Sequence, residues 1–320
     1  MKAFAKPKMN FFFLFALAMV TLVGCKKEDN NTPPSTIVDV LSNNGFSTLT
    51  SLAVSANLGG TLTSTGPFTL FAPSNDAFNG VTAPTGDALT NLLTYHVIGG
   101  AGLSASDVVG LSNGNLISVT MANGDSVFVR ASSNGVFVNG IQVNQADLRA
   151  DNGIVHGIGR ILFPPTGNIV ETAINTPGFD SLVKAVVQVS GAGTTGMDNI
   201  AQVLSTLNGV TVFAPTNDAF AALFANQSFP FRSISEIPND VLRTVLLHHA
   251  VTSRAFSNDL QNGTIAMANG SSITVSGVGT NNIILAGSGT VFTNTGAGIP
   301  ATNIMARNGV IHVIDRVLIP

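Results

Sequence analysis

The chain has 320 residues, which is enough for two domains of ordinary size. Hydrophobic residues make up 45% of the chain, so its composition is that of a globular protein and excludes a disordered one. Only 10% of the residues are charged and the net charge is −3, which excludes the basic surface of a nucleic-acid-binding protein. Uncharged polar residues must cover most of the surface, which favours contact by hydrogen bonding and shape over electrostatic steering.

The first 25 residues have the layout of a secretory signal peptide. Three lysines precede the apolar run 11–23, which is too short to span a bilayer comfortably. The run ends in Leu22-Val23-Gly24-Cys25, which resembles the lipobox of bacterial lipoproteins and implies acylation of Cys25. Because Cys25 is the single cysteine, we expect no disulfide within the mature domains. An ordinary signal peptide with an incidental cysteine is the alternative.

Residues 26–35 form a predicted linker. Its start, Lys26-Lys27-Glu28-Asp29-Asn30, resembles the signal that sends lipoproteins of the Bacteroidetes group to the cell exterior. We therefore expect an outer-membrane protein that is anchored by lipid on Cys25 and faces the cell exterior. A solvated charged tether is the alternative interpretation of the same residues.

An internal repeat divides the rest of the chain. The segment 68–78 (FTLFAPSNDAF) is repeated at 210–220 (VTVFAPTNDAF), and 152–164 is repeated at 308–320. A repeat of this length indicates duplicated domains and excludes a solenoid of short units. We predict the first domain at residues 36–164 and the second at residues 168–320.

The first motif predicts a strand, a turn and a helix. Its apolar run ends at Pro73, which cannot continue a central strand. Ser74, or Thr216 in the second copy, is a favourable N-cap for the following helix. Phe78 and Phe220 then lie where they can anchor that helix in the core.

The second motif predicts a hairpin and a buried strand. It begins with Asn-Gly, a signal for a two-residue hairpin turn, and continues with residues 154–163, which are apolar at nearly every position. Other strands are expected around the Asn-Gly pairs at 123, 139 and 269. Helices are expected at residues 36–42, 87–96, 169–174, 180–189 and 240–250. Because helices come early and strands late in each repeat, the predicted fold class is α+β.

Both motifs, with Tyr95-His96 at the end of a helix between them, resemble the signature segments of the fasciclin domain family. In the second copy His248-His249 stands at the place of Tyr95-His96. The resemblance covers nearly all of the mature chain. It implies two tandem fasciclin-like domains, each a wedge-shaped seven-stranded β-sandwich with helices packed at one side. It also implies cell adhesion or extracellular-matrix binding. We expect no catalytic activity and no cofactor, because the sequence contains no catalytic constellation.

The resemblance makes Tyr95, His96, His248 and His249 a candidate interaction segment, because this segment is linked to integrin binding in animal members of the family. The alternative is a structural role, in which the histidines tie helices to strands by hydrogen bonds. We favour the structural role for the histidines that recur at matching places, since each has apolar neighbours and none has the spacing of metal ligands. These are His96, His156, His249 and His312.

No pattern in the chain predicts an enzyme. Residues 110–114 (GLSNG) match the nucleophile elbow of serine hydrolases, but a strand is predicted after them where that motif needs a helix. The second copy lacks the pattern, so we interpret it as a chance match. Glycine-rich phosphate motifs and Cys/His clusters are also missing from the sequence.

Two further patterns concern the surface. Phe224, Phe229 and Phe231 form either an exposed patch for a partner or, as we favour, part of the local core. Asp125-Ser126-Val127 and Asp180-Ser181-Leu182 resemble short O-glycosylation acceptors of the Bacteroidetes.

These observations predict a lipid-anchored surface protein that binds an extracellular protein or polysaccharide, contacts the membrane through Cys25 and binds no nucleic acid. The alternative function is a glycan-capture lipoprotein of an outer-membrane uptake system. That function needs exposed aromatic platforms for sugar rings, and the chain has no tryptophan and one tyrosine.

Overall fold

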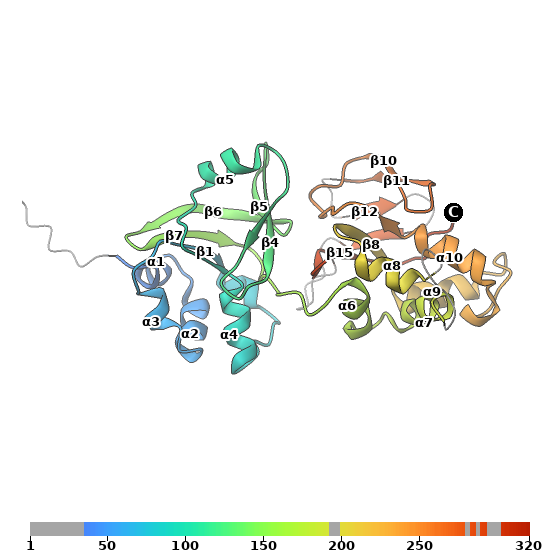
Figure 1. Ribbon diagram of the computed structural model, residues 1–320, viewed down its shortest axis with the longest axis horizontal. Coiled ribbons are helices and arrows are strands. Elements are labelled where there is room, and N and C mark those ends of the chain that lie inside the picture. The colour runs from blue at the N-terminus through green and yellow to red at the C-terminus, as the bar shows by residue number, and fades with distance from the viewer. Residues whose placement is uncertain (1–34, 192–198, 279–281, 286–288, 293–301) are drawn as a thin grey trace, which may run out of the picture. The chain divides into compact units, whose positions relative to one another are not determined.

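The computed structural model describes residues 35–191, 199–278, 282–285, 289–292 and 302–320 (Figure 1). The predicted signal peptide, the lipid site Cys25 and most of the predicted linker lie outside these residues. Within the described ranges, no helix combines the length and the apolar character that a membrane crossing requires.

The first repeat forms an α+β domain between Ile37 and Ile158. Its helices are α1 (Ile37–Asn43), α2 (Ser47–Ser55), α3 (Gly59–Leu62), α4 (Asp87–Thr94) and α5 (Ala105–Ser112), with a 3-10 turn, η1, at Asn75–Phe78. Its strands are β1 (Phe68–Pro73), β2 (Val97–Gly99), β3 (Ile117–Thr120), β4 (Ser126–Ser132), β5 (Gly135–Val138), β6 (Ile141–Ala150) and β7 (Gly153–Ile158).

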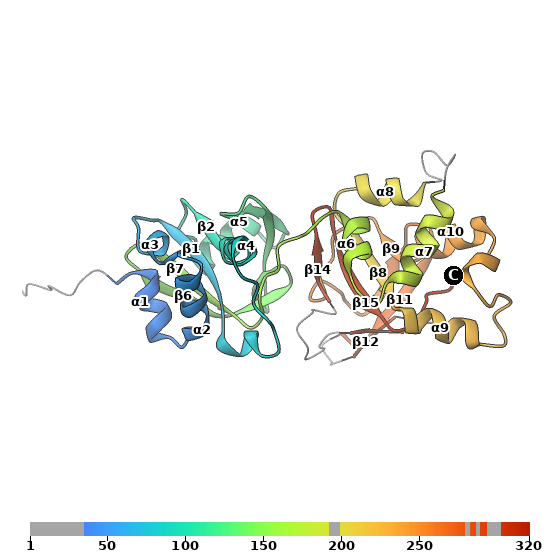
Figure 2. The same ribbon diagram turned by 90° about the horizontal axis from the view of Figure 1, so that it is seen from below.

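The seven strands form one hydrogen-bonded sheet in the order β2-β1-β7-β6-β5-β4-β3. The long strand β6 pairs with β5 at its start and with β7 over the rest, and its register shifts between Val143 and Leu148. Irregularities of this kind bend a strand and increase its twist. The sheet therefore folds over into the two layers of a sandwich, and helices α1 to α4 gather at one side of it (Figures 1 and 2).

The second repeat forms a similar domain between Ile169 and Ile314. Its helices are α6 (Ile169–Asn175), α7 (Asp180–Val189), α8 (Ile200–Thr206), α9 (Asn217–Ala225) and α10 (Asn239–Leu247), with a 3-10 turn, η3, at Ile234–Glu236. Its strands are β8 (Val210–Pro215), β9 (Ala250–Val251), β10 (Gly263–Ala266), β11 (Ser272–Ser276), β12 (Asn282–Leu285), β13 (Gly289–Phe292), β14 (Ile304–Ala306) and β15 (Gly309–Ile314).

The two domains share one central feature, a parallel pair made by the two repeated motifs. In the first domain β1 runs parallel to β7, and in the second β8 runs parallel to β15. The described sheet of the second domain has eight strands instead of the predicted seven. Two short strands, β13 and β14, pair with β15 at the place where the first domain has the single strand β6. The predicted α+β fold with two tandem domains is confirmed.

Each domain has one hydrophobic core on the helix side of its sheet and another inside the folded sheet. In the first domain, one core lies between the helices and the sheet around Ile37, Leu41 and Leu93, and the other lies inside the folded sheet around Phe71 and Val127. The second domain repeats this arrangement with a large helix-side core and a smaller core inside the sheet. Burial of both faces explains why β7 and β8 are buried at every position.

The predicted hairpin is present, but the role of its Asn-Gly pair differs from the prediction. Gly153 does not lie in the turn, since it is the first residue of β7 and pairs with Phe68. A Cβ on Gly153 would overlap the carbonyl of Phe68, so only glycine allows β1 to approach this closely. Asn152 holds three backbone groups: its Oδ1 accepts from Ile37 N at 2.9 Å, and its Nδ2 donates to the carbonyls of Leu62 and Ser64.

Four local predictions need correction. The strand predicted over residues 154–163 ends at Ile158, and the helix predicted to reach residue 96 ends at Thr94. The helix predicted over residues 240–250 ends at Leu247, and residue 250 begins a short strand. Ser74 makes no side-chain cap bond, and the segment after it is a 3-10 turn. Thr216 does cap α9, because its hydroxyl accepts a hydrogen bond from Ala219 N at 3.2 Å.

Candidate functional site

The candidate interaction segment of the first domain is buried. Tyr95 and His96 directly follow α4, and their side chains are 0% and 1% exposed. In the second domain His248 and His249 follow α10 and are 4% and 2% exposed. None of the four side chains can touch a partner while the domains are folded.

His96 and His249 tie the end of a helix to the segment after the last strand of each domain. His96 Nδ1 donates to the carbonyl of Leu92 at 2.8 Å, and its Nε2 accepts from Leu162 N at 3.0 Å. His249 Nδ1 donates to the carbonyl of Val245 at 2.7 Å, and its Nε2 accepts from Leu318 N at 2.8 Å. A carbonyl only accepts and an amide N–H only donates, so both rings are held as neutral Nδ1–H tautomers. The histidines thus have the structural role that was favoured, but they tie the helix to the segment after the strand and not to the strand itself.

Tyr95 and His248 occupy the same place but reach different partners. The Tyr95 hydroxyl donates to the carbonyl of Ser126 at 2.9 Å and accepts from Asn139 Nδ2 at 3.1 Å. His248 is shorter, and its Nδ1 contacts the Ser271 hydroxyl at 2.5 Å. Both residues thus join the helix end to the strand region of their own domain. Burial raises the pKa of the Tyr95 phenol, which therefore stays protonated.

His156 and His312 are the histidines of the second motif, and each joins its strand to a loop. His156 Nε2 donates to the carbonyl of Leu103 at 2.8 Å, and its Nδ1 accepts from Asp147 N at 3.3 Å. His312 makes the matching pair of bonds with the carbonyl of Ala255 and with Asn303 N. Both ring nitrogens are again occupied by the backbone.

Electrostatics supports a structural role for these histidines. Burial lowers the pKa of His96, His249 and His312 to about 4, since an imidazolium ion would lose its hydration there. These rings are therefore neutral at physiological pH. With both nitrogens engaged, they offer no lone pair to a metal and no proton to a substrate.

The other candidate sites are also accounted for by local structure. Ser112, the central residue of the nucleophile-elbow pattern, is buried at the end of α5 and does not follow a strand. Phe224, Phe229 and Phe231 pack against the helix-side core. Together with Phe220 they form a series of contacting rings, in which the centroids of successive rings are 5.6 to 6.3 Å apart. The described residues contain no group of three His, Cys, Asp or Glu side chains that could hold a metal ion. The glycosylation candidates Ser126 and Ser181 are both half-buried.

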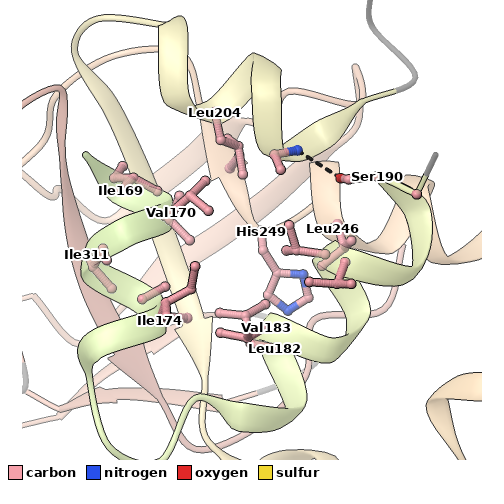
Figure 3. A pocket seen from close by; sticks show the side chains of 18 residues that line it. Ile169, Val170, Ile174, Leu182, Val183, Ser190, Leu204, Leu246, His249 and Ile311 are labelled. Atoms are coloured by element: carbon pink, nitrogen blue, oxygen red, sulfur yellow. Dashed lines mark hydrogen bonds between the residues drawn. The ribbon is translucent and has the colours of Figure 1, made fainter. Parts of the chain in front are cut away.

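One feature of the second domain has no counterpart in the sequence predictions. A cavity of about 260 Å³ opens between α6, α7, α8 and the sheet (Figure 3). Its walls are aliphatic, and His249 and Ser190 are the two side chains with polar atoms among the residues that line it. One sequence difference indicates this cavity: Ala173 of the second repeat stands where the first repeat has Leu41.

The two repeats also match a known protein family. The model of the fasciclin domain matches this chain twice, at residues 44–164 and 190–320. Each match contains both repeated motifs and one pair of the parallel central strands.

Individual relatives match one or both copies. Protein sll1483 of Synechocystis is 36% identical over 140 residues, which cover 41% of this chain and 74% of that protein. The transforming growth factor-beta-induced protein ig-h3 of Sus scrofa is 28% identical over 268 residues, which cover 80% of this chain. Periostin of Homo sapiens is 32% identical over 133 residues, or 38% of this chain. The matched residues span only 35% of ig-h3 and 15% of periostin.

A solved structure is similar over most of the length. The FAS1 domain pair from the insect cell adhesion molecule fasciclin I aligns with 87% of this chain and 98% of its own. The sequence identity is 18% and the TM-score is 0.39.

Proposed function

The chain belongs to the fasciclin domain family, and from this premise we propose that it is a two-domain binding module on the cell exterior. Its partner in this proposal is an extracellular protein or a polysaccharide. Fasciclin domains are associated with cell adhesion and matrix binding. The observation that carries the proposal is the family match in both copies of the repeat.

The buried histidines support binding over catalysis. Every recurring histidine has its ring nitrogens bound to backbone groups, and three of them have a pKa near 4. General acid–base work at neutral pH needs a group with a pKa near the working pH and free access to a substrate. His96, His249 and His312 have neither property, and both ring nitrogens of His156 are bonded to the backbone. The four histidines therefore stabilise the fold of the domains.

The surface supports recognition by hydrogen bonds and shape. Charged residues amount to 14 Lys and Arg and 17 Asp and Glu in 320 residues, so the electrostatic field around the protein is weak. Since Tyr95 and the adjacent histidine are buried, the contacts come from other residues, on loops and outward-facing strand positions.

The acylated Cys25 is the proposed attachment point to the outer membrane. Each buried methylene of a lipid chain contributes about 0.8 kcal/mol, so two or more acyl chains hold a protein firmly. In this arrangement the linker up to residue 35 separates the membrane from the first domain.

Glycan capture for an uptake system is the second candidate function, and the structure offers it less support. The chain has no tryptophan, and its one tyrosine, Tyr95, is buried. Sugar-binding sites built on tyrosine or tryptophan platforms are therefore not open to it.

The test is deletion of residues 36–320 with the signal peptide, Cys25 and the linker retained. Cells that carry the deletion should lose attachment to matrix or to other cells, while the truncated lipoprotein still reaches the membrane. A Cys25→Ala variant is the control for the anchor, since it should release the folded domains into the medium. Unchanged attachment of the deletion strain would contradict the proposal.

A further inference from the structure

The cavity of the second domain is formed by aliphatic side chains from helices α6, α7, α8 and α10 and from the sheet. Residues of α6, α7 and α8 form three sides, and β8 and β15 form the floor (Figure 3). Its volume of about 260 Å³ exceeds the roughly 150 Å³ of an apolar cavity that admits benzene. The space is therefore large enough to hold a small apolar molecule.

The first domain shows how the same space is filled by protein. Ile37 N donates to Asn152 Oδ1, and Ile169 N donates to Asn308 Oδ1, so the two isoleucines are equivalent. Four residues further along each helix stand Leu41 and Ala173. Leu41 is fully buried in the helix-side core of the first domain, whereas Ala173 lines the cavity.

A second pair of smaller side chains lies where β9 of the second domain, like β2 of the first, pairs with a central strand. Leu70 pairs with Val97 in the first domain, and Val212 pairs with Ala250 at the same register in the second. Val212 and Ala250 both line the cavity.

A third difference follows α2 and α7. Thr48 N bonds to Asn75 Oδ1, and Ser181 N bonds to Asn217 Oδ1, which aligns the starts of these two helices. Beyond the helix ends, Leu58 packs on the helix-side core of the first domain, whereas Gly191 lines the cavity of the second. Smaller side chains at several positions thus leave the space open.

The polar atoms at the cavity are already paired. His249 uses one ring nitrogen for the carbonyl of Val245 and the other for Leu318 N. The Ser190 hydroxyl accepts from Ala201 N at 2.9 Å. A charged group inside would find no counter-ion, so the enclosed part of any ligand must be uncharged.

The edge of the cavity is apolar as well. Ile174 of α6 and Val187 of α7 line it, and they are 57% and 62% exposed. Large aliphatic side chains that remain this exposed next to an apolar cavity favour a ligand that extends from the cavity to the surface.

We propose that this cavity binds an unbranched aliphatic chain, such as the acyl chain of a fatty acid or a lipid. The walls fit this chemistry because they are formed by Val, Ile, Leu and Ala side chains, with the imidazole of His249 as the one ring. The chain end enters toward Val212 and Ile311, and the polar head remains outside the cavity beside Ile174 and Val187.

The test uses the unlipidated chain from Lys26 onward, with decanol as the probe. Decanol should bind with a stoichiometry of one in calorimetry, and it should shift the methyl NMR signals of Val170, Val183 and Ile311. Ala173→Leu, which restores the residue of the first domain, should weaken binding at least about tenfold. The matched control Ala221→Leu, on the exposed face of α9, should leave affinity within about twofold.

A second variant distinguishes a filled cavity from misfolding of the first variant. Ala250→Val restores the Val97 of the first domain and should also weaken binding. Phosphatidylcholine vesicles separate the two sources of an acyl chain: cosedimentation that Ala173→Leu abolishes identifies membrane lipid, and decanol binding without cosedimentation identifies a free molecule. The proposal is overturned if decanol does not bind the wild-type chain. It is equally overturned if a folded Ala173→Leu variant binds decanol as tightly as wild type.

Discussion

Phe71 stacks on His156, with ring centroids 5.7 Å apart and an interplanar angle of 30°. Phe213 and His312 repeat this contact at 5.7 Å and 29°. The contact joins the first motif of each repeat to the second, because the two residues are register partners in the parallel pair of strands. The repeated motifs are therefore two halves of one structural unit.

The pH dependence of stability follows from the buried histidines. Burial lowers the pKa of His96, His249 and His312 to about 4, whereas an unfolded histidine has a pKa near 6.5. Between these values the unfolded chain binds more protons, so the free energy of unfolding falls as the pH decreases from about 6.5 to 4. Each group contributes on the order of 3 kcal/mol across the whole window. Urea denaturation at several pH values measures this, and a constant unfolding free energy between about pH 7.5 and 4.5 would rule it out.

Tyr95→Phe tests the role of the tyrosine. The change removes two hydrogen bonds of a buried hydroxyl and leaves Asn139 Nδ2 without that partner. We expect a loss of about 1–3 kcal/mol in the free energy of unfolding. Attachment of cells to a matrix should be unchanged below the melting temperature, because the side chain is fully buried. Lost attachment by a stable, folded variant would show that Tyr95 contacts the partner.

Thr216 and Ser74 stand at equivalent positions before a helical segment, so their alanine variants can be compared directly. Thr216→Ala removes the cap bond to Ala219 N and should cost about 1 kcal/mol of stability. Ser74→Ala should cost much less, since Ser74 makes no cap bond. Thermal denaturation of both variants checks the difference, and equal losses would show that the capping geometry is wrong.

Filling the cavity should stabilise the second domain. Ala173→Leu adds a side chain where the first domain has Leu41, and cavity filling of this kind commonly adds about 0.5–2 kcal/mol. The reverse change, Leu41→Ala, should cost about 2–5 kcal/mol, because it opens a cavity in a packed core. Differential scanning calorimetry of the two variants measures both effects. A destabilised Ala173→Leu variant would mean that the two domains are packed differently at this place.

Binding to the partner should depend weakly on salt. The surface carries few charges of either sign, so few ion pairs are available to be screened. We expect the affinity for an isolated partner to change less than about threefold between roughly 0.05 and 0.5 M sodium chloride. A tenfold or larger loss at the higher concentration would indicate an electrostatic interface.

The repeat made much of the fold predictable. Two long motifs in the same order indicated duplicated domains. The apolar run before Pro73 and the hairpin signal at Asn152 correctly indicated a strand at each place, although the second strand is shorter than predicted. The parallel pairing of the motifs could not be predicted, because the motifs are about eighty residues apart in the chain and no local pattern links them. Helices α2, α3, α5 and α8 were missed, since they are short or rich in Ser, Thr and Gly, which have weak helix propensity.

The site residues were only partly predictable. Apolar neighbours correctly indicated that His96 and His249 lie in the core, but the sequence did not show that Tyr95 is buried with them. Tyrosine is common both at surfaces and in cores. Tyr95 can be buried because its hydroxyl has a hydrogen-bond partner in Asn139, which lies 44 residues away in the sequence. The cavity depends on how the two repeats differ at Ala173, which becomes informative only once Ile37 and Ile169 are known to be equivalent.

The most direct measurement of the proposed function is a competition experiment with intact cells. The unlipidated chain from Lys26 onward is added at increasing concentration to cells that carry the full protein, and attachment to the matrix is counted. The account predicts a saturable, concentration-dependent loss of attachment, because the soluble domains occupy the same partner. Undiminished attachment in the presence of an excess of folded, soluble chain would contradict it.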